Sequence, residues 1–165
     1  MNASKALDIK PNIGISEKNL DIISEVLSVI LSSEMTLYVK TRKAHWNVSG
    51  ESFMEFHKVF EKQYKQLEEG IDEVAERIGK LGRKTIGTMH EYLKLSAIKE
   101  APGKYETSKD FLKELLKDHE TVIVNLRKDV EDCAEKYKDA GTADFLTGLM
   151  KNHETMAWVL RRYLS

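Results

Sequence analysis

Residues 53 to 78 repeat their apolar side chains at the spacing of an α-helix, and this repeat constrains the fold more than any other feature of the chain. At about 100° of rotation per residue, one set of side chains clusters near roughly 290° from His57. That set contains Phe53, Phe56, Phe60, Leu67, Ile71, Val74 and Ile78. A stripe of acids, Glu61, Glu68, Asp72 and Glu76, runs beside it at roughly 20° to 100°. The pattern predicts a long amphipathic helix whose apolar face packs into a helical bundle.

Three further long helices follow from the same spacing. The predicted long helices span residues 16–44, 52–79, 108–140 and 142–164, with Ser16, Ser52 and Thr142 as N-terminal caps. Residues 83–107 form a long connection with a short helix near residues 89–96. The predicted fold class is therefore all-α, a four-helix bundle with one long crossover connection carrying a short helix. Residues 1–15 are expected to be a flexible arm, and residues 16–165 the single domain.

Composition and charge exclude several other classes of protein. The 165 residues are 41% hydrophobic and 32% charged, with 9 glycines and 2 prolines, as expected of a soluble helical domain. A net charge of -1 gives no general attraction to DNA or to membranes. Cys133 is the only cysteine, so no intramolecular disulfide can form, and its reactivity is open. The first residues lack an apolar core of signal-peptide length, and we expect a cytoplasmic protein without a membrane span.

Four side chains suggest a metal centre. His45 and His57 lie twelve positions apart, and Asp72 and Glu76 follow on the helix that carries His57. Imidazole and carboxylate together suit a divalent first-row metal such as iron. From His57 to Asp72 the helix rises roughly 22 Å, which is beyond the reach of one ion. If the four residues serve one centre, two subunits must meet around a two-fold axis and each must give half of the ligands.

Ordinary structural roles also fit these residues. His45 falls on the apolar side of the first helix, where a histidine can be a core residue, and Asp72 and Glu76 could be a solvated face near Arg77. A di-iron site inside the bundle would need Glu-x-x-His pairs, and none of the five histidines has a glutamate three positions before it. The remaining histidines have no partners at metal-site spacing and are expected on the surface. They are His90, His119 and His153.

Two stretches resemble one known family. AHWNVSGESFMEFHKVFE (residues 44–61) and IDEVAERIGKLG (residues 71–82) have the form of the two signatures of the Dps family, the ferritin-like proteins that protect DNA in starved bacterial cells. The stretch GTADFLTGLMKNHETMAWVLRRYL (residues 141–164) is also similar to this family. The resemblance extends from about residue 16 to the end of the chain.

The resemblance implies a hollow dodecamer of four-helix subunits that oxidises Fe2+ with hydrogen peroxide and stores the ferric mineral inside. It assigns His45 and His57 to one subunit of a two-fold ferroxidase centre, and Asp72 and Glu76 to the other. Glu61 stands where the family has Asp or Glu, and would hold a second iron or a water.

Further roles are expected for residues around this centre. The resemblance places Trp46 near the iron, where it would intercept radicals, and places Asp139 and Asp144 at an acidic three-fold pore that admits cations. For Asp144 a favourable interaction with a helix dipole is an equal alternative. Glu68 lies on the acidic stripe without a ligand role, and we expect it to help nucleate the mineral.

Two other functions compete with iron oxidation. A DNA-compacting nucleoid protein would bind phosphates through a lysine-rich arm. Residues 1–18 carry Lys5, Lys10 and Lys18 against Asp8 and Glu17, a side-chain charge of 3 − 2 = +1, so any contribution of each arm to DNA binding is small. The second competing function is that of a helical adaptor without a metal, which would be a monomer.

Overall fold

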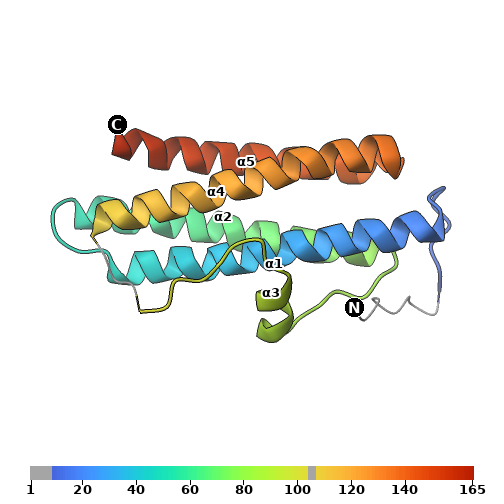
Figure 1. Ribbon diagram of the computed structural model, residues 1–165, viewed down its shortest axis with the longest axis horizontal. Helices are drawn as coiled ribbons and strands as arrows, with labels where there is room; N and C mark the ends of the chain where they lie inside the picture. The colour runs from blue at the N-terminus through green and yellow to red at the C-terminus, as the bar shows by residue number, and fades with distance from the viewer. Residues whose placement is uncertain (1–8, 104–106) are drawn as a thin grey trace.

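Four long helices lie side by side and form the bundle (Figure 1). The computed structural model describes residues 9–103 and 107–165, and predictions on residues 1–8 and 104–106 lie outside this range. The long helices are α1 (Glu17–Asn47), α2 (Phe53–Lys80), α4 (Ser108–Glu131) and α5 (Ala140–Leu164). A short helix, α3 (Met89–Leu95), interrupts the crossover, and a π-helical turn, η1 (Asp132–Lys136), follows α4. The predicted all-α bundle with a helix in its crossover is confirmed.

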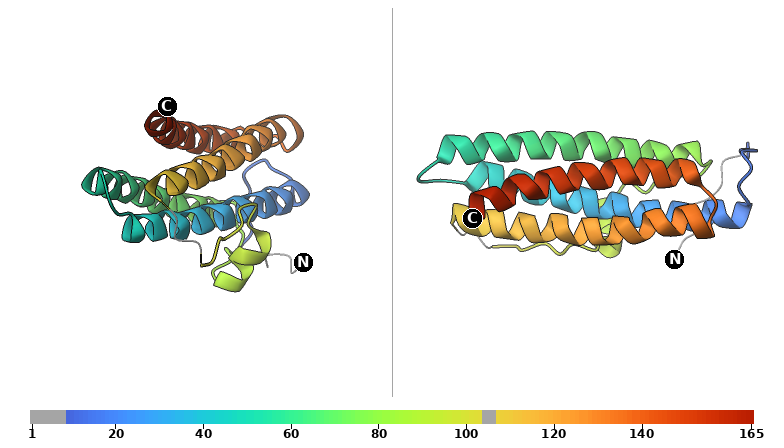
Figure 2. Two further views of the ribbon diagram at one scale, coloured as in Figure 1. Left: turned by 60° about the vertical axis from the view of Figure 1, so that its left-hand side comes forward. Right: turned by 90° about the horizontal axis from the view of Figure 1, so that it is seen from above.

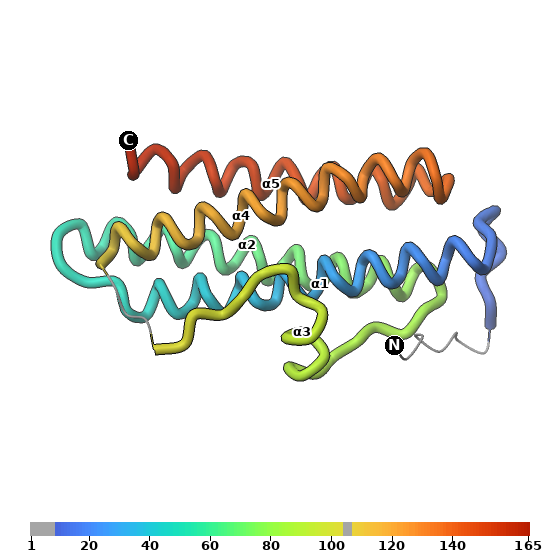
Figure 3. The backbone as a smooth tube through the Cα atoms, viewed as in Figure 1, coloured from blue at the N-terminus to red at the C-terminus, as the bar shows by residue number. Residues whose placement is uncertain are grey.

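The bundle consists of two helix pairs, α1 with α2 and α4 with α5 (Figures 1, 2 and 3). The crossover carries the chain from the end of α2 to the start of α4, and α3 packs against α1 on the way. Leucines, isoleucines and Phe60 from the long helices fill the centre, and many of them are completely buried. Burial of this apolar surface is the main stabilising contribution to the bundle.

Helix α1 begins as predicted but continues further. The Ser16 side-chain oxygen accepts a hydrogen bond from the Asn19 backbone N–H at 3.2 Å, which caps the first turn. The helix runs through Asn47, three residues beyond the predicted end at Ala44, because no glycine or proline occurs before Gly50. The extension matters for function, since it places His45 and Trp46 on the last turn of a helix rather than in a loop.

Helix α1 also meets the length and composition required of a membrane span. An 18-residue window has a mean hydropathy of 1.5, but 56% of that window is buried inside the bundle. The core helix of a soluble protein has the same composition, because its apolar face packs against neighbouring helices.

The corner between α4 and α5 differs from the prediction. Helix α4 ends at Glu131, not near Ala140, and Thr142 lies inside α5 instead of capping it. The cap is Asp139, whose carboxylate accepts hydrogen bonds from the Thr142 backbone N–H at 2.9 Å and from the Thr142 hydroxyl. Arg77 of α2 pairs with the same carboxylate at 3.2 Å, so the corner is held by an ion pair as well as a cap.

Cys133 lies in the π-helical turn η1 and is completely buried. Burial, together with Asp129 and Asp139 nearby, raises the pKa of its thiol to about 12. At pH 8 the thiolate is therefore roughly one thiol in ten thousand, and only the thiolate is nucleophilic. We expect iodoacetamide to leave Cys133 unmodified in the folded protein and to alkylate it fully in denaturant, as read by intact mass. Rapid alkylation of the folded protein would contradict this placement.

Gly82 follows α2 in the left-handed region, with a φ of 72°, and Pro11 lies directly over it. A Cβ at this position would lie 2.4 Å from Pro11 Cδ, whereas a Cβ at Gly50, with a φ of 85°, would meet no atom within 4 Å. Replacing either glycine by alanine therefore strains the backbone, and replacing Gly82 also causes a clash with Pro11.

Gly82→Ala should lower the free energy of unfolding more than Gly50→Ala, the matched control. We expect Gly50→Ala to lose about 1 kcal/mol from backbone strain. Gly82→Ala should lose roughly 1–3 kcal/mol more from overpacking against Pro11. Urea titration of both variants measures the difference, and equal losses would show that Pro11 gives way freely.

Candidate metal centre

His45 and His57 meet where the end of α1 passes the start of α2. Their rings stack with centroids 3.7 Å apart and an interplanar angle of 23°. His45 Nδ1 lies 2.8 Å from the His57 backbone carbonyl, and His57 Nδ1 lies 3.0 Å from the His45 carbonyl. The two residues therefore hold each other in place through a reciprocal pair of hydrogen bonds between the helices.

These two hydrogen bonds select one tautomer for each ring. A carbonyl oxygen only accepts, so each Nδ1 must carry the proton that it donates. In a neutral imidazole the proton on Nδ1 leaves a lone pair on Nε2. Metal-binding histidines typically use this arrangement, in which the ring nitrogen that is not a ligand donates to a carbonyl and fixes the ring orientation. Both rings of the pair thus present a nitrogen that is prepared for a divalent metal.

Glu61 lies one helical turn after His57, on the same side of α2. Its carboxylate pairs with Lys65 at 2.6 Å, and this hydrogen bond and the lysine charge lower the pKa of Glu61. An anionic carboxylate therefore stands next to the histidine pair, engaged with a flexible surface lysine that can release it.

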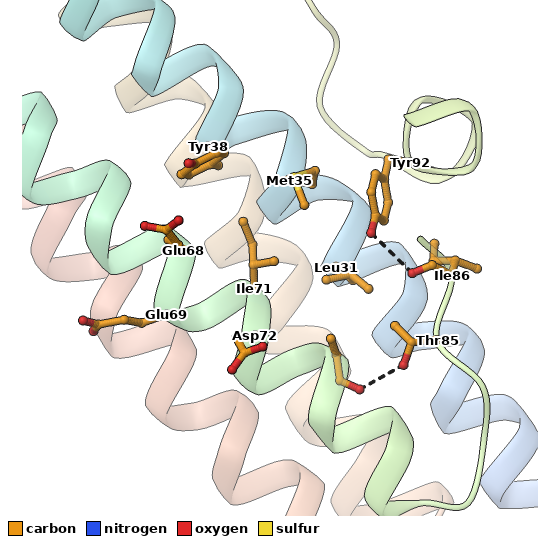
Figure 4. Close-up of a pocket in the computed structure, with 11 residues that line it drawn as sticks. Leu31, Met35, Tyr38, Glu68, Glu69, Ile71, Asp72, Thr85, Ile86 and Tyr92 are labelled. Atoms are coloured by element: carbon orange, nitrogen blue, oxygen red, sulfur yellow. Dashed lines mark hydrogen bonds between the residues drawn. The ribbon is translucent and has the colours of Figure 1, made fainter. Parts of the chain in front are cut away.

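Asp72 and Glu76 lie further along α2 and are exposed. Glu76 pairs with Lys80 at 3.1 Å, and Asp72 lies at the edge of a groove of about 640 Å³ between α1, α2 and the crossover. Figure 4 shows Glu68, Glu69 and Asp72 on α2 beside Tyr38 and Met35 of α1, with the Glu69 carboxylate directed away from α1. Most of the other lining residues are apolar, among them Leu31, Met35, Ile71, Ala75 and Ile86.

The structure brings the two histidines together and leaves the two acids apart from them. Across residues 9–103 and 107–165, no group of three or more His, Cys, Asp or Glu side chains converges on a point where a metal could bind. Asp72 lies 15 positions after His57 on α2, which corresponds to roughly 22 Å along the helix axis. The chain therefore presents two partial ligand sets at separate places on α2.

Comparisons with known proteins identify the fold family. Residues 24–165 match the ferritin-like domain. DNA protection during starvation protein 2 of Bacillus anthracis is 37% identical over 143 residues, which cover 87% of this chain and 97% of that protein. The chain belongs to the Dps family of ferritin-like proteins. This confirms the resemblance seen in residues 44–61 and 71–82.

Other relatives agree with this assignment. An uncharacterized low temperature-induced protein of Nostoc is 40% identical over 93% of this chain and 86% of that protein. A Dps protein from Vibrio cholerae, described as a member of a broad superfamily of ferritin-like diiron-carboxylate proteins, superposes with a TM-score of 0.88 at 27% identity. That comparison covers 98% of this chain and 100% of the Vibrio chain.

Trp46 adjoins the histidine pair in this Dps-family chain but points away from the core. Its side chain is 64% exposed, and the Arg42 guanidinium lies 5.2 Å from its ring. The same guanidinium lies 4.5 Å from the ring of Tyr64, whose edge meets the His45 ring at a centroid distance of 5.2 Å. Tyr64 thus lies against His45, and the Arg42 guanidinium lies near the rings of both Tyr64 and Trp46.

The two predicted pore acids have different environments. Asp144 is exposed on the first turns of α5. Asp139 is buried, with 3% of its surface exposed, and its carboxylate is engaged by Arg77 and Thr142. The prediction that Asp139 lines a pore does not fit this arrangement, because a carboxylate that caps α5 and pairs with the partly buried Arg77 guanidinium is not available to passing cations.

The surface placement predicted for His119 and His153 is wrong, whereas His90 is exposed as expected. Both buried histidines have 0% of their surface exposed, and they lie between α4 and α5 with Glu34 of α1 beside them. The sequence contains a pattern that predicts the burial of both histidines. Leu115 and Val122 flank His119 at helical spacing, as Met150 and Met156 flank His153.

Proposed function

We propose that this chain is a ferroxidase that oxidises Fe2+ with hydrogen peroxide and stores the ferric product inside a homo-oligomeric shell of twelve subunits. The observation that carries the proposal is the His45–His57 pair, whose Nδ1 atoms are both engaged by carbonyls so that both Nε2 atoms are prepared to bind a metal. Membership of a ferritin-like family supports iron as that metal.

The centre needs a second copy of the chain. In this proposal Asp72 and Glu76 of one subunit complete the site begun by His45 and His57 of its partner, around a two-fold axis. Two features support this pairing. Both carboxylates are exposed rather than turned into their own bundle, and Asp72 lines a largely apolar groove that a second copy of the chain would cover. Glu61 would hold a second iron or a water beside the histidines.

The chemistry follows from pairing two one-electron donors with one two-electron acceptor. Two Fe2+ ions and one hydrogen peroxide, with two protons, give two Fe3+ ions and two water molecules, so no hydroxyl radical leaves. Carboxylates favour the ferric product because their negative charge stabilises the higher cation charge. Iron and peroxide are consumed together, and DNA is protected by removal of both reagents.

Three residues would assist this reaction. Trp46 would intercept a stray radical at the outer edge of the histidine pair. Glu68, which lines the same groove as Asp72, would help nucleate the mineral, and Asp144 would attract cations at a pore. We place the reaction in the cytoplasm, where relatives named for DNA protection during starvation would act. Direct DNA compaction is not proposed, since residues 1–18 carry Lys5, Lys10 and Lys18 against Asp8 and Glu17, a side-chain charge of 3 − 2 = +1.

Complementation between two defective variants tests the shared centre. His45→Ala with His57→Ala, and Asp72→Ala with Glu76→Ala, should each abolish peroxide-driven Fe2+ oxidation. When the two variants are unfolded and refolded together in equal amounts, about a quarter of the sites should be intact, because half of the two-fold pairs are mixed and each mixed pair has one complete site. Absorbance of the ferric product measures the rate.

The control for this experiment is His90→Ala, which removes an exposed histidine outside the centre and should leave oxidation unchanged. Size exclusion must show that both defective variants assemble. If co-assembled variants remain inactive while each retains its assembly, the ligands do not come from two subunits.

Trp46→Phe tests the radical role separately from iron binding. The substitution keeps an aromatic ring but removes the easily oxidised indole, so ferric product should form at an unchanged rate while more hydroxyl radical escapes. Spin trapping during turnover measures the escape. Equal radical yields in Trp46→Phe and the parent protein would remove Trp46 from the proposal.

A further inference from the structure

Three ionisable side chains form a hydrogen-bonded row through the centre of the bundle, away from the histidine pair described above. His153 Nε2 of α5 lies 2.7 Å from Glu34 Oε1 of α1, and His153 Nδ1 lies 2.9 Å from His119 Nδ1 of α4. All three residues have 0% of their surface exposed. The row thus joins three of the four long helices within the apolar core.

The two ends of the row have no hydrogen-bond partner in the described part of the chain. These ends are His119 Nε2 and Glu34 Oε2. Asp118, next to His119 in the sequence, pairs with Lys40 of α1. From α2, the uncharged Gln63 donates to the Met156 carbonyl. The charges of Glu34, His153 and His119 therefore have to balance one another.

The geometry determines how many protons the row can hold. Each of its two hydrogen bonds needs one proton, since two facing lone pairs or two facing N–H groups repel each other. Glu34, His153 and His119 have zero net charge when they hold three protons in total. The third proton then lies at one of the two unpartnered ends of the row, His119 Nε2 or Glu34 Oε2. With two protons the core carries a negative charge, and with four a positive charge, and a buried unpaired charge is strongly unfavourable.

We propose that Glu34, His153 and His119 form a buried site that binds three protons as one unit, and that a fourth proton, added in acid, opens the bundle. The fourth proton either breaks the Nδ1–Nδ1 hydrogen bond by occupying His119 Nδ1 or leaves an imidazolium in the core without a counter-charge. Burial and the neighbouring charge of His153 hold the pKa of His119 well below its usual value, which agrees with a His119 that resists protonation while folded.

The sign of the resulting pH dependence follows from proton counting. In the unfolded chain His119 takes up a proton near pH 6.5, whereas the folded chain does not. Below pH 6.5 the unfolded state therefore binds more protons than the folded state, and stability falls as the pH falls. Above this range that destabilising contribution of His119 is absent.

The experiment compares unfolding of the iron-free parent protein with His119→Gln, which removes the titrating group but keeps a hydrogen-bonding side chain. Between pH 7 and pH 5 the unfolding equilibrium constant of the parent should rise about 20- to 30-fold more than that of the variant. Urea titrations at one protein concentration measure the change within each protein, so a uniform loss of stability in the variant does not affect the result. His90→Gln, at an exposed histidine, is the control and should follow the parent.

Neutron diffraction of the parent protein at pH 7 gives a second test that does not depend on a variant that folds. It should locate one proton in each of the two hydrogen bonds and a third at one end of the row, on His119 Nε2 or Glu34 Oε2. Parallel pH profiles of the parent and His119→Gln would overturn the proposal. A neutron map with two protons in the row, or with four, would also overturn it.

Discussion

The reciprocal hydrogen bonds between His45 and His57 are the interaction on which the functional part of the structure depends. Each ring nitrogen Nδ1 is engaged by the other residue's backbone carbonyl, at 2.8 and 3.0 Å, so the end of α1 and the start of α2 are joined at the residues that would bind metal. A turn joins the two helices nearby, yet the ring orientation comes from the hydrogen bonds and from stacking at 3.7 Å. A rearranged turn would change both the fold at this corner and the ligand geometry.

The length of α2 has an equally direct consequence. A straight helix places the histidine end and the acidic end roughly 22 Å apart, and no loop intervenes to fold one onto the other. A chain that uses both ends for one centre must therefore use two copies. Activity and assembly then depend on the same surface, because the apolar groove that a second copy would cover adjoins Asp72. In this account an isolated subunit would be a folded protein without a complete centre.

The sequence was sufficient to predict the helical bundle, because amphipathic spacing determines which faces of long helices are buried. It also indicated His45 and His57 as a pair, but not that each donates to the other's carbonyl, since that contact depends on the path of the turn between the helices. The corner before α5 was mispredicted because Asp139 and Thr142 are both good caps, and only the tertiary contact of Asp139 with Arg77 distinguishes them. His119 and His153 were misplaced because histidine is polar in composition, while their apolar neighbours at helical spacing bury them.

The position of the iron tests the central claim most directly. Crystals of the assembled protein soaked with Fe2+ should show anomalous scattering at the iron edge between His45 and His57 of one subunit and Asp72 and Glu76 of its two-fold partner. The contrary result would be iron bound within a single bundle, for example beside Glu34, His119 and His153, or at a surface away from the contact between subunits. Either position would contradict a centre shared by two copies of the chain.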